Sequence, residues 1–400
     1  MPKGQNIFGL LNKIQSSHIT VHQQRCAVVR NRNANCMRCA EVCTSGCISI
    51  IDDELVVKPE NCIGCGTCAT ICPTCALEAH QPDDAKLFMH CTKVMKQTDG
   101  IVSIACHKHL DKAGNSLDRE KVVEVKCLGR VEESLIIMLA ALGCRQISLV
   151  ASDCDSCPHH HGFKAACAVT SSANELLQAW HSTCTVKLSS TFPRVCRMQD
   201  TSFDASKRSF LQKGARNAKS IGYLTEEYAA EQIIKKIDST PDNAKKENPR
   251  YTRVQADGTL PHFIPSRRRR LLEGLEALGE PKDALIDTRL WGHVIIDADL
   301  CDSCQRCATF CPTGALQKFK EQDGSFGIDH FPSRCVKCRC CEDICHSGAI
   351  SVSNEVFTDD IMTCAYERYR MKPLEFQPGN LRQMHERIGK LIGVEEVYDH

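Results

Sequence analysis

The most constraining feature of this sequence is a pair of cysteine runs in its last quarter. One run begins at Cys301 and reads CDSCQRCATFCP, and the other begins at Cys335 and reads CVKCRCCEDICH. Each has the spacing Cys-x2-Cys-x2-Cys-x3-Cys. Three thiolates on one tight loop can cap three irons of a cube, and a thiolate from elsewhere closes the fourth corner. The spacing therefore predicts two [4Fe–4S] clusters, each held by three cysteines of one run and the last cysteine of the other.

This crossed arrangement defines two sets of four ligands. Zinc ribbons with four cysteines are the alternative, because they also use Cys-x2-Cys pairs. Zinc requires neither the x2-x2-x3 rhythm nor Pro312 after the fourth cysteine, so iron–sulfur ligation is favoured. In these residues the chain resembles the bacterial two-cluster ferredoxins. The first C-terminal set is predicted to be Cys301, Cys304, Cys307 and Cys345, and the second C-terminal set Cys311, Cys335, Cys338 and Cys341.

A second pair of runs lies near the N-terminus, and one of the two is incomplete. Residues 62–72 read CIGCGTCATIC and carry all four cysteines at the required spacing. Residues 36–43 carry only the last three positions, and the first position would fall at Asn33, which is a poor ligand. Either Cys26, brought in by a loop insertion, or Cys47 can complete this run.

Cys26 is favoured over Cys47 because of the register of the four runs. Cys47 occupies the position that Ala315 fills in a C-terminal run, where a small residue begins the next strand, and Cys75 likewise takes the position of Gly314. Both are interpreted as small buried residues. The first N-terminal set is therefore predicted to be Cys26, Cys36, Cys39 and Cys72, and the second N-terminal set Cys43, Cys62, Cys65 and Cys68.

Between residues 83 and 200, short apolar strands alternate with helical patterns, which is typical of a parallel sheet. Three of the strands end at or near a cysteine, and ligands of such sheets bind at the carboxyl ends of the strands. One further metal centre, of the [2Fe–2S] type, is therefore predicted. Zinc at the same place and structural burial of the cysteines are the alternatives. The middle set is Cys106, Cys127, Cys154 and Cys157.

The same region carries a family resemblance. The segment CLGRV, a helix and then GCRQISLVASDCDSC resemble the iron–sulfur delta subunit of the methyl-viologen-reducing hydrogenases. The resemblance implies a [2Fe–2S] cluster placed between a hydrogenase and a flavin-containing partner. The histidine run at residues 159–161 is interpreted as a solvated loop. The cysteines without ligand spacing are interpreted as packing residues, namely Cys91, Cys144, Cys167, Cys184, Cys196 and Cys364.

Composition limits the cellular setting. Twenty-nine cysteines would indicate disulfides in a small secreted protein, but this chain has 400 residues and its cysteines cluster at metal-ligand spacings. The N-terminus lacks a signal-peptide core and a twin-arginine pair, and no apolar run approaches the length of a membrane span. A formal net charge of +1 gives no indication of nucleic-acid binding. A cytoplasmic protein without a membrane span is expected.

These patterns predict an α+β protein in which two ferredoxin-like 2[4Fe–4S] modules flank a small α/β parallel-sheet domain. Helices are also expected at residues 7–14, 220–237 and 381–391, and Arg267–Arg270 are interpreted as the solvated start of another. The predicted units are an N-terminal 2[4Fe–4S] domain at 1–82, the α/β domain at 83–200, a helical and linker region at 201–290, a C-terminal 2[4Fe–4S] domain at 291–356 and a helical tail at 357–400.

The motifs that the sequence lacks limit the classes of function that are expected. The chain has no GxGxxG after a strand, no P-loop and no nucleophile elbow, so no nucleotide, flavin or substrate site is evident. We expect an electron-transfer subunit of an anaerobic oxidoreductase complex. Its expected partners are a hydrogenase, a molybdenum or tungsten enzyme such as formate dehydrogenase, or a flavoprotein resembling the heterodisulfide reductase A subunit. An enzyme acting at the middle centre, and a redox sensor or scaffold, are the alternatives.

Overall fold

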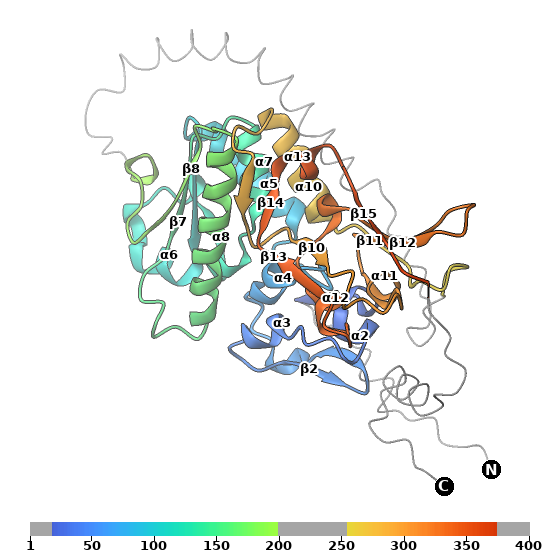
Figure 1. Cartoon of the computed structure of the whole chain (residues 1–400). Helices are drawn as coiled ribbons and strands as arrows, with labels where there is room; N and C mark the ends of the chain where they lie inside the picture. The colour runs from blue at the N-terminus through green and yellow to red at the C-terminus, as the bar shows by residue number, and fades with distance from the viewer. Residues whose placement is uncertain (1–17, 199–253, 374–400) are drawn as a thin grey trace, which may run out of the picture.

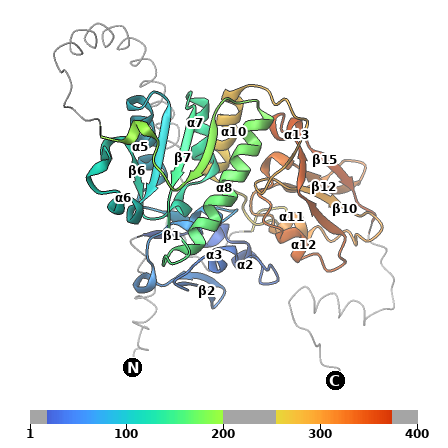
Figure 2. The same cartoon turned by 90° about the vertical axis from the view of Figure 1, so that its left-hand side faces the viewer.

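The computed structural model describes residues 18–198 and 254–373. They form an N-terminal cysteine-rich module, a central domain around a parallel sheet, and a C-terminal cysteine-rich module (Figure 1). The two modules share a small apolar cluster, and the central domain packs against both (Figure 2). The predicted mixture of helices and strands around a parallel sheet is confirmed.

The N-terminal module consists of two antiparallel strand pairs and short helices. β1 pairs with β4, and β2 pairs with β3 through a turn in which Asp52 and Asp53 both have positive φ. This hairpin lies between the two N-terminal cysteine runs. The elements are β1 (Ile19–Val21), α2 (Ala27–Arg30), α3 (Arg38–Glu41), β2 (Ile48–Ile51), β3 (Glu54–Val57), α4 (Thr67–Ile71) and β4 (Leu77–Ala79).

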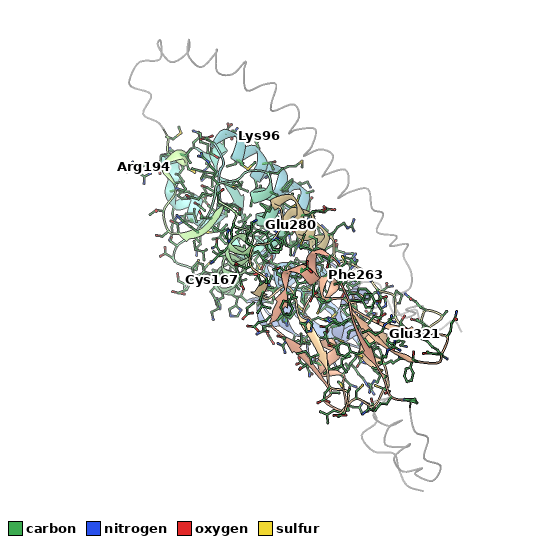
Figure 3. The ribbon with its side chains drawn as sticks, turned by 45° about the horizontal axis from the view of Figure 1, so that its top comes forward. Lys96, Cys167, Arg194, Phe263, Glu280 and Glu321 are labelled. Atoms are coloured by element: carbon green, nitrogen blue, oxygen red, sulfur yellow. The ribbon has the colours of Figure 1, made fainter. Side chains whose placement is uncertain are left out.

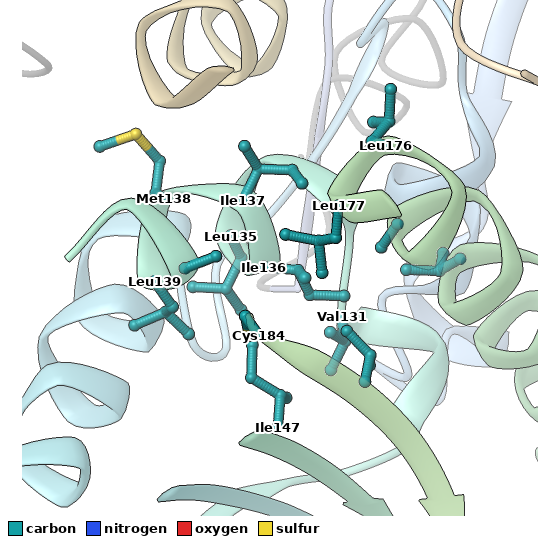
Figure 4. Close-up of a cluster of buried hydrophobic side chains, with 14 of the residues drawn as sticks. Val131, Leu135, Ile136, Ile137, Met138, Leu139, Ile147, Leu176, Leu177 and Cys184 are labelled. Carbon is teal, nitrogen blue, oxygen red and sulfur yellow. The ribbon is translucent and has the colours of Figure 1, made fainter. Parts of the chain in front are cut away.

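The central domain has a four-stranded sheet in the order β6-β5-β7-β8, and all its neighbouring strands are parallel. Its helix α7 is apolar on every side and almost wholly buried, as expected of a helix covered all round. Figure 4 shows its side chains between the strands and α8. The elements are α5 (Asp84–Gln97), β5 (Ile101–Cys106), α6 (His107–Ala113), β6 (Val123–Val125), η5 (Leu128–Arg130), α7 (Glu133–Ala141), β7 (Gln146–Val150), α8 (His160–Ala179) and β8 (Thr185–Ser189).

Helix α10 (Ser266–Leu278) covers the remaining face of α7 with Leu271 and Leu275. The interpretation of its first arginines as solvated was wrong. Arg268 and Arg270 are buried, because Arg270 pairs with Asp84 at 2.5 Å and Arg268 lies over the Trp291 ring at 4.1 Å. The sequence could not show this, since the acidic partner lies 186 residues away.

The C-terminal module repeats the strand pairing of the N-terminal one and adds a three-stranded sheet in the order β11-β12-β15. The tail expected to be helical from residue 357 instead begins with the short helix α13 and the strand β15. The elements are β9 (Leu285–Asp287), β10 (His293–Ile296), α11 (Arg306–Phe310), β11 (Leu316–Lys320), β12 (Phe326–His330), α12 (Cys340–Asp343), β13 (Ile350–Ser353), β14 (Glu355–Phe357), α13 (Thr358–Met362) and β15 (Glu367–Arg370).

The helices expected at residues 7–14, 220–237 and 381–391 lie outside the described residues. Among the helices of residues 18–198 and 254–373, none has both the length and the apolar composition that crossing a membrane requires.

Candidate iron–sulfur centres

The four cysteines of the middle set line one cavity of about 360 Å³ at the edge of the parallel sheet. β5 ends on Cys106, β6 ends two residues before Cys127, and β7 ends four residues before Cys154. Parallel strands bring their carboxyl ends to the same edge, so three loops deliver these thiols to one place. Cys157 follows in the turn that leads into α8. The sheet therefore assembles the middle set from residues that are far apart in the sequence.

The chemistry of the middle set fits a cluster held by four thiolates. None of these cysteines is in a disulfide. Burial raises the pKa of the Cys127 thiol to about 12, and the neighbouring charges of Cys106 and Cys157 add to that shift. Without a metal the Cys127 thiol is therefore neutral, and binding iron must displace its proton. The histidine run that follows is not a loop throughout, since α8 begins at His160, and His159 lines the cavity.

A close backbone approach fixes the position of the Cys127 sulfur. A Cβ atom placed on Gly162 would lie 2.2 Å from the Cys127 Sγ, which is well inside van der Waals contact. A Cβ on Gly129 would lie 2.3 Å from the Thr67 Oγ1 in helix α4 of the N-terminal module. Both positions require glycine because η5, α4 and the start of α8 meet here. The middle set is thereby held against the N-terminal module.

The structure groups Cys26 with the other members of the first N-terminal set. Burial raises the pKa of Cys39 to about 12, and the charges of Cys72, Cys26 and Cys36 raise it further. Cys26 precedes α2 directly and is buried. The charges of the other three thiols thus act on Cys39, so the four cysteines lie close together, and their joint ligation of one cluster stays a prediction.

Cys47 lies with the second N-terminal set instead. Its sulfur is 3.4 Å from that of Cys43, and the hydrogen bond between these two thiols lowers the pKa of Cys43. A further hydrogen bond joins Cys47 to Cys62. Cys47 is therefore a buried thiol beside predicted ligands of the second N-terminal set.

Replacing Cys26 or Cys47 by alanine distinguishes a cluster ligand from a buried neighbour of one. Cys26→Ala is expected to lose about four irons per chain, because one corner of a cube is left open. Cys47→Ala is the matched control and should retain them, since Cys47 contacts a predicted ligand but is not itself one. Iron and acid-labile sulfide counts on anaerobically purified protein measure the difference. Loss of iron in Cys47→Ala with none in Cys26→Ala would reverse the assignment.

The remaining three sets are also brought together. Burial raises the pKa of Cys68 well above its usual value, and Cys65, Cys62 and Cys43 of its own set contribute. In the C-terminal module burial likewise raises the pKa of Cys307, with contributions from Cys304, Cys301 and Cys345 of the first C-terminal set. Burial also raises the pKa of Cys341, with contributions from Cys338, Cys335 and Cys311 of the second.

The two cysteine-rich modules meet at a junction that the sequence did not predict. Arg30 of α2 is buried there and donates to the carbonyl oxygens of Phe310 at 3.1 Å and Cys311 at 3.2 Å. The backbone N–H of Asn35 donates to Asp343 at 2.8 Å. An apolar cluster completes the contact with Ala27, Ala34, Cys340 and Ile344, and Cys36, Phe310 and Cys338 pack against it.

Comparison with known proteins agrees with this geometry. The model of the 4Fe-4S dicluster domain matches residues 300–349, and that of the 4Fe-4S binding domain matches residues 55–78. The chain is 36% identical over 53 residues to a protein named Ferredoxin 7Fe from Hydrogenibacillus schlegelii, which covers 13% of this chain and 68% of the relative. The chain belongs to the ferredoxin family. The prediction of [4Fe–4S] modules and of an iron–sulfur electron-transfer protein is confirmed.

Other relatives share only parts of this ferredoxin. Pyruvate synthase subunit PorD from Methanocaldococcus jannaschii is 36% identical over 61 residues, which is 15% of this chain and 66% of PorD. Putative oxidoreductase AegA from Escherichia coli K12 is 38% identical over 52 residues, which is 13% of this chain and 8% of AegA. The chain thus spans two thirds or less of these two relatives. The two family matches lie over the cysteine runs of the two modules, outside the central domain.

Proposed function

We propose that this ferredoxin is the relay subunit of a larger cytoplasmic oxidoreductase complex of anaerobic metabolism, with four [4Fe–4S] clusters and one [2Fe–2S] cluster. One arrangement supports the proposal: packing contacts and charge effects between neighbouring sets link the five cysteine sets in a series. Its order is the middle set, the second N-terminal set, the first N-terminal set, the second C-terminal set and the first C-terminal set. Clusters of these types carry single electrons, with potentials tuned by burial and by hydrogen bonds to sulfur.

The first step of the series joins the central domain to the N-terminal module. The charge of Cys65, in the second N-terminal set, contributes to the raised pKa of Cys127 in the middle set. Ile63 of the same loop lines the cavity of the middle set. Within the module, the charge of Cys39 in the first N-terminal set acts on Cys68 of the second. These three sets are therefore consecutive neighbours.

The second half of the series crosses the junction between the modules. Cys36 of the first N-terminal set and Cys338 of the second C-terminal set pack against the same apolar cluster. The charge of Cys307, in the first C-terminal set, then contributes to the raised pKa of Cys341. Apolar packing keeps water away from the junction, and Arg30 places a fixed positive charge beside Cys311 and Cys338.

Both ends of the series can be reached by a partner. Cys304 of the first C-terminal set is exposed, and the middle set is open to its cavity. The central domain and the C-terminal module also lie at opposite ends in Figure 3, where Lys96 and Arg194 mark one end and Glu321 the other. An electron donor at one end and an acceptor at the other fit this arrangement. The classes that we propose are a hydrogenase, a molybdenum or tungsten subunit resembling formate dehydrogenase, and a flavoprotein resembling the heterodisulfide reductase A subunit.

The middle set also helps to choose between a relay and the alternative, an enzyme that acts at the middle centre. Substrate turnover at this centre would need an iron without a cysteine ligand. All four cysteines of the middle set line the cavity, which favours complete ligation by cysteine and hence a relay. The resemblance to the hydrogenase delta subunit supports the same proposal.

Removing the middle set tests this proposal. Cys127→Ala is expected to lose about two irons and the EPR signal of a [2Fe–2S] centre, while the [4Fe–4S] signals persist. Reductive titration of the unaltered protein should take up about five electrons per chain reversibly. Cys167→Ala, an exposed cysteine of α8, is the control and should change neither value.

Two results would contradict the proposal. Zinc in place of iron in the anaerobically purified protein would exclude a relay. A redox sensor would be indicated instead if exposure to air removed the clusters and changed partner binding, and if the protein took up no electrons reversibly.

A further inference from the structure

A cluster of three potential metal ligands lies outside the cysteine sets. It consists of His293 on β10, His330 on β12 and Glu367 on β15. One ligand atom from each residue lies within 4.8 Å of the others. β10 belongs to one sheet and β12 and β15 to another, so the cluster connects the two sheets of the C-terminal module.

His330 is the residue that most requires an explanation. It is 0% exposed, and neither ring nitrogen has a hydrogen-bond partner within residues 18–198 and 254–373. Buried imidazole nitrogens are normally satisfied, because leaving them unpaired loses their interaction with water without replacement. Among the described residues, the ring nearest to it is that of His293, which lies edge-on with 5.3 Å between the ring centroids. The Nδ1 of His293 likewise has no hydrogen-bond partner there.

The unpaired nitrogens of His330 suit metal binding. A neutral imidazole offers the lone pair of one ring nitrogen to a metal ion. A metal ion bound there would satisfy a nitrogen that has no hydrogen-bond partner in the described part of the chain.

Carboxylates beside the two histidines supply the negative charge that a metal cation requires. The Oε2 of Glu367 lies 3.2 Å from the Nε2 of His293 and accepts a hydrogen bond from the Tyr369 hydroxyl at 2.8 Å. Metal-bound groups are commonly oriented by such outer contacts. Asp360 lies close enough that the charges of Glu367 and His293 both act on it. Because Glu367 is exposed, the group is open to solvent on one side, which gives an ion a route of entry.

We propose that His293, His330 and Glu367 form a binding site for a divalent transition-metal ion of the zinc class. Two imidazole nitrogens, one carboxylate oxygen and a water molecule give the four-coordinate set that zinc adopts. Zinc has no redox chemistry, so the ion ties β10 to the β12 and β15 strands and takes no part in electron transfer. The site shares no residue with the cysteine sets and does not rest on the relay proposed above.

Metal analysis of the full chain tests the site. We expect about one zinc per chain after anaerobic purification with zinc supplied, and a zinc K-edge spectrum with nitrogen and oxygen ligands at about 2.0–2.1 Å. Glu367→Gln should abolish this zinc and leave iron unchanged. Tyr369→Phe, which removes only the outer contact, should weaken zinc binding about 10- to 100-fold. His330→Ala should also lose the zinc.

The control variant is Glu78→Gln, because Glu78 forms a similar pair with His22 at 3.0 Å but belongs to no three-ligand group among the described residues. It should retain the zinc. Absence of zinc, zinc unaffected by Glu367→Gln, or a spectrum with sulfur ligands at about 2.3 Å would overturn the proposal, since sulfur ligation would mean zinc in the cysteine sets. If His330→Ala loses iron through misfolding, Glu367→Gln decides the outcome.

Discussion

Replacing Cys338 by alanine is expected to divide the relay into two halves that no longer exchange electrons. Cys338 belongs to the second C-terminal set and lies at the junction of the modules, where it packs near Cys36. Loss of one cube should remove about four irons. Because the proposed series links the sets one after another, electrons supplied at the middle set should reach the first N-terminal set and stop there. Freeze-quench EPR after rapid reduction at one end would follow which centres are reduced.

Cys340→Ala is the matched control for this experiment. Cys340 is buried in the same junction, two residues from Cys338, but it is not a predicted ligand. Its replacement should keep all the irons and the order of reduction. If the centres beyond the junction are reduced as fast in Cys338→Ala as in the unaltered protein, the series has a second path and the proposed order is wrong.

Asp84→Asn is expected to destabilise the protein by about 3–5 kcal/mol, the usual cost of breaking a buried ion pair on one side. Asp84 pairs with Arg130 at 2.5 Å, Arg267 at 3.0 Å and Arg270 at 2.5 Å. The arginine side chains are 2%, 12% and 10% exposed. Without the carboxylate, three buried positive charges would repel one another. The midpoint of anaerobic thermal or urea unfolding measures the effect.

The pH dependence of this network follows from the same contacts. Burial alone would raise the pKa of Asp84, but the charges of Arg267, Arg130 and Arg270 hold it well below its usual value. A depressed folded-state pKa stabilises the protein above the unfolded value of about 3.9, and this stabilisation is lost as the pH falls through the folded pKa. The destabilisation by Asp84→Asn should therefore be constant across neutral pH.

Asp99→Asn provides the comparison, because Asp99 forms a single pair with Arg145 in which the two side chains are 89% and 60% exposed. An exposed pair contributes about 0–1 kcal/mol. Equal effects of the two substitutions would show that the Asp84 network does not stabilise the contact between α5 and α10.

Much of the candidate site could be predicted because cysteine spacing is local. Ligands two or three residues apart share one loop, so residues 62–72 and 301–345 define their sets without knowledge of the fold. The middle set was predictable for a different reason, since its strands carry apolar runs that end near Cys106, Cys127 and Cys154. Parallel strands bring such ends to one edge.

The features that could not be predicted depend on contacts between distant segments. From its sequence context Arg30 would be expected on the surface. It is buried because the C-terminal module packs over it, and its acceptor Phe310 lies 280 residues away in the sequence. His330 lies on an alternating strand with no motif around it, and its neighbours come from two other strands. Spacing carries no information on these points.

The hydrophobic core of the central domain has a consequence for how this ferredoxin operates. That core combines residues from α5 to β8 with Leu271 and Leu275 of α10 and with Trp291, Val356 and Ile361 of the C-terminal part of the chain. The C-terminal module therefore cannot swing away from the central domain without exposing apolar surface to water. A carrier that diffuses between partners slows in a viscous medium, whereas transfer within this rigid body should proceed at the same rate in glycerol as in buffer.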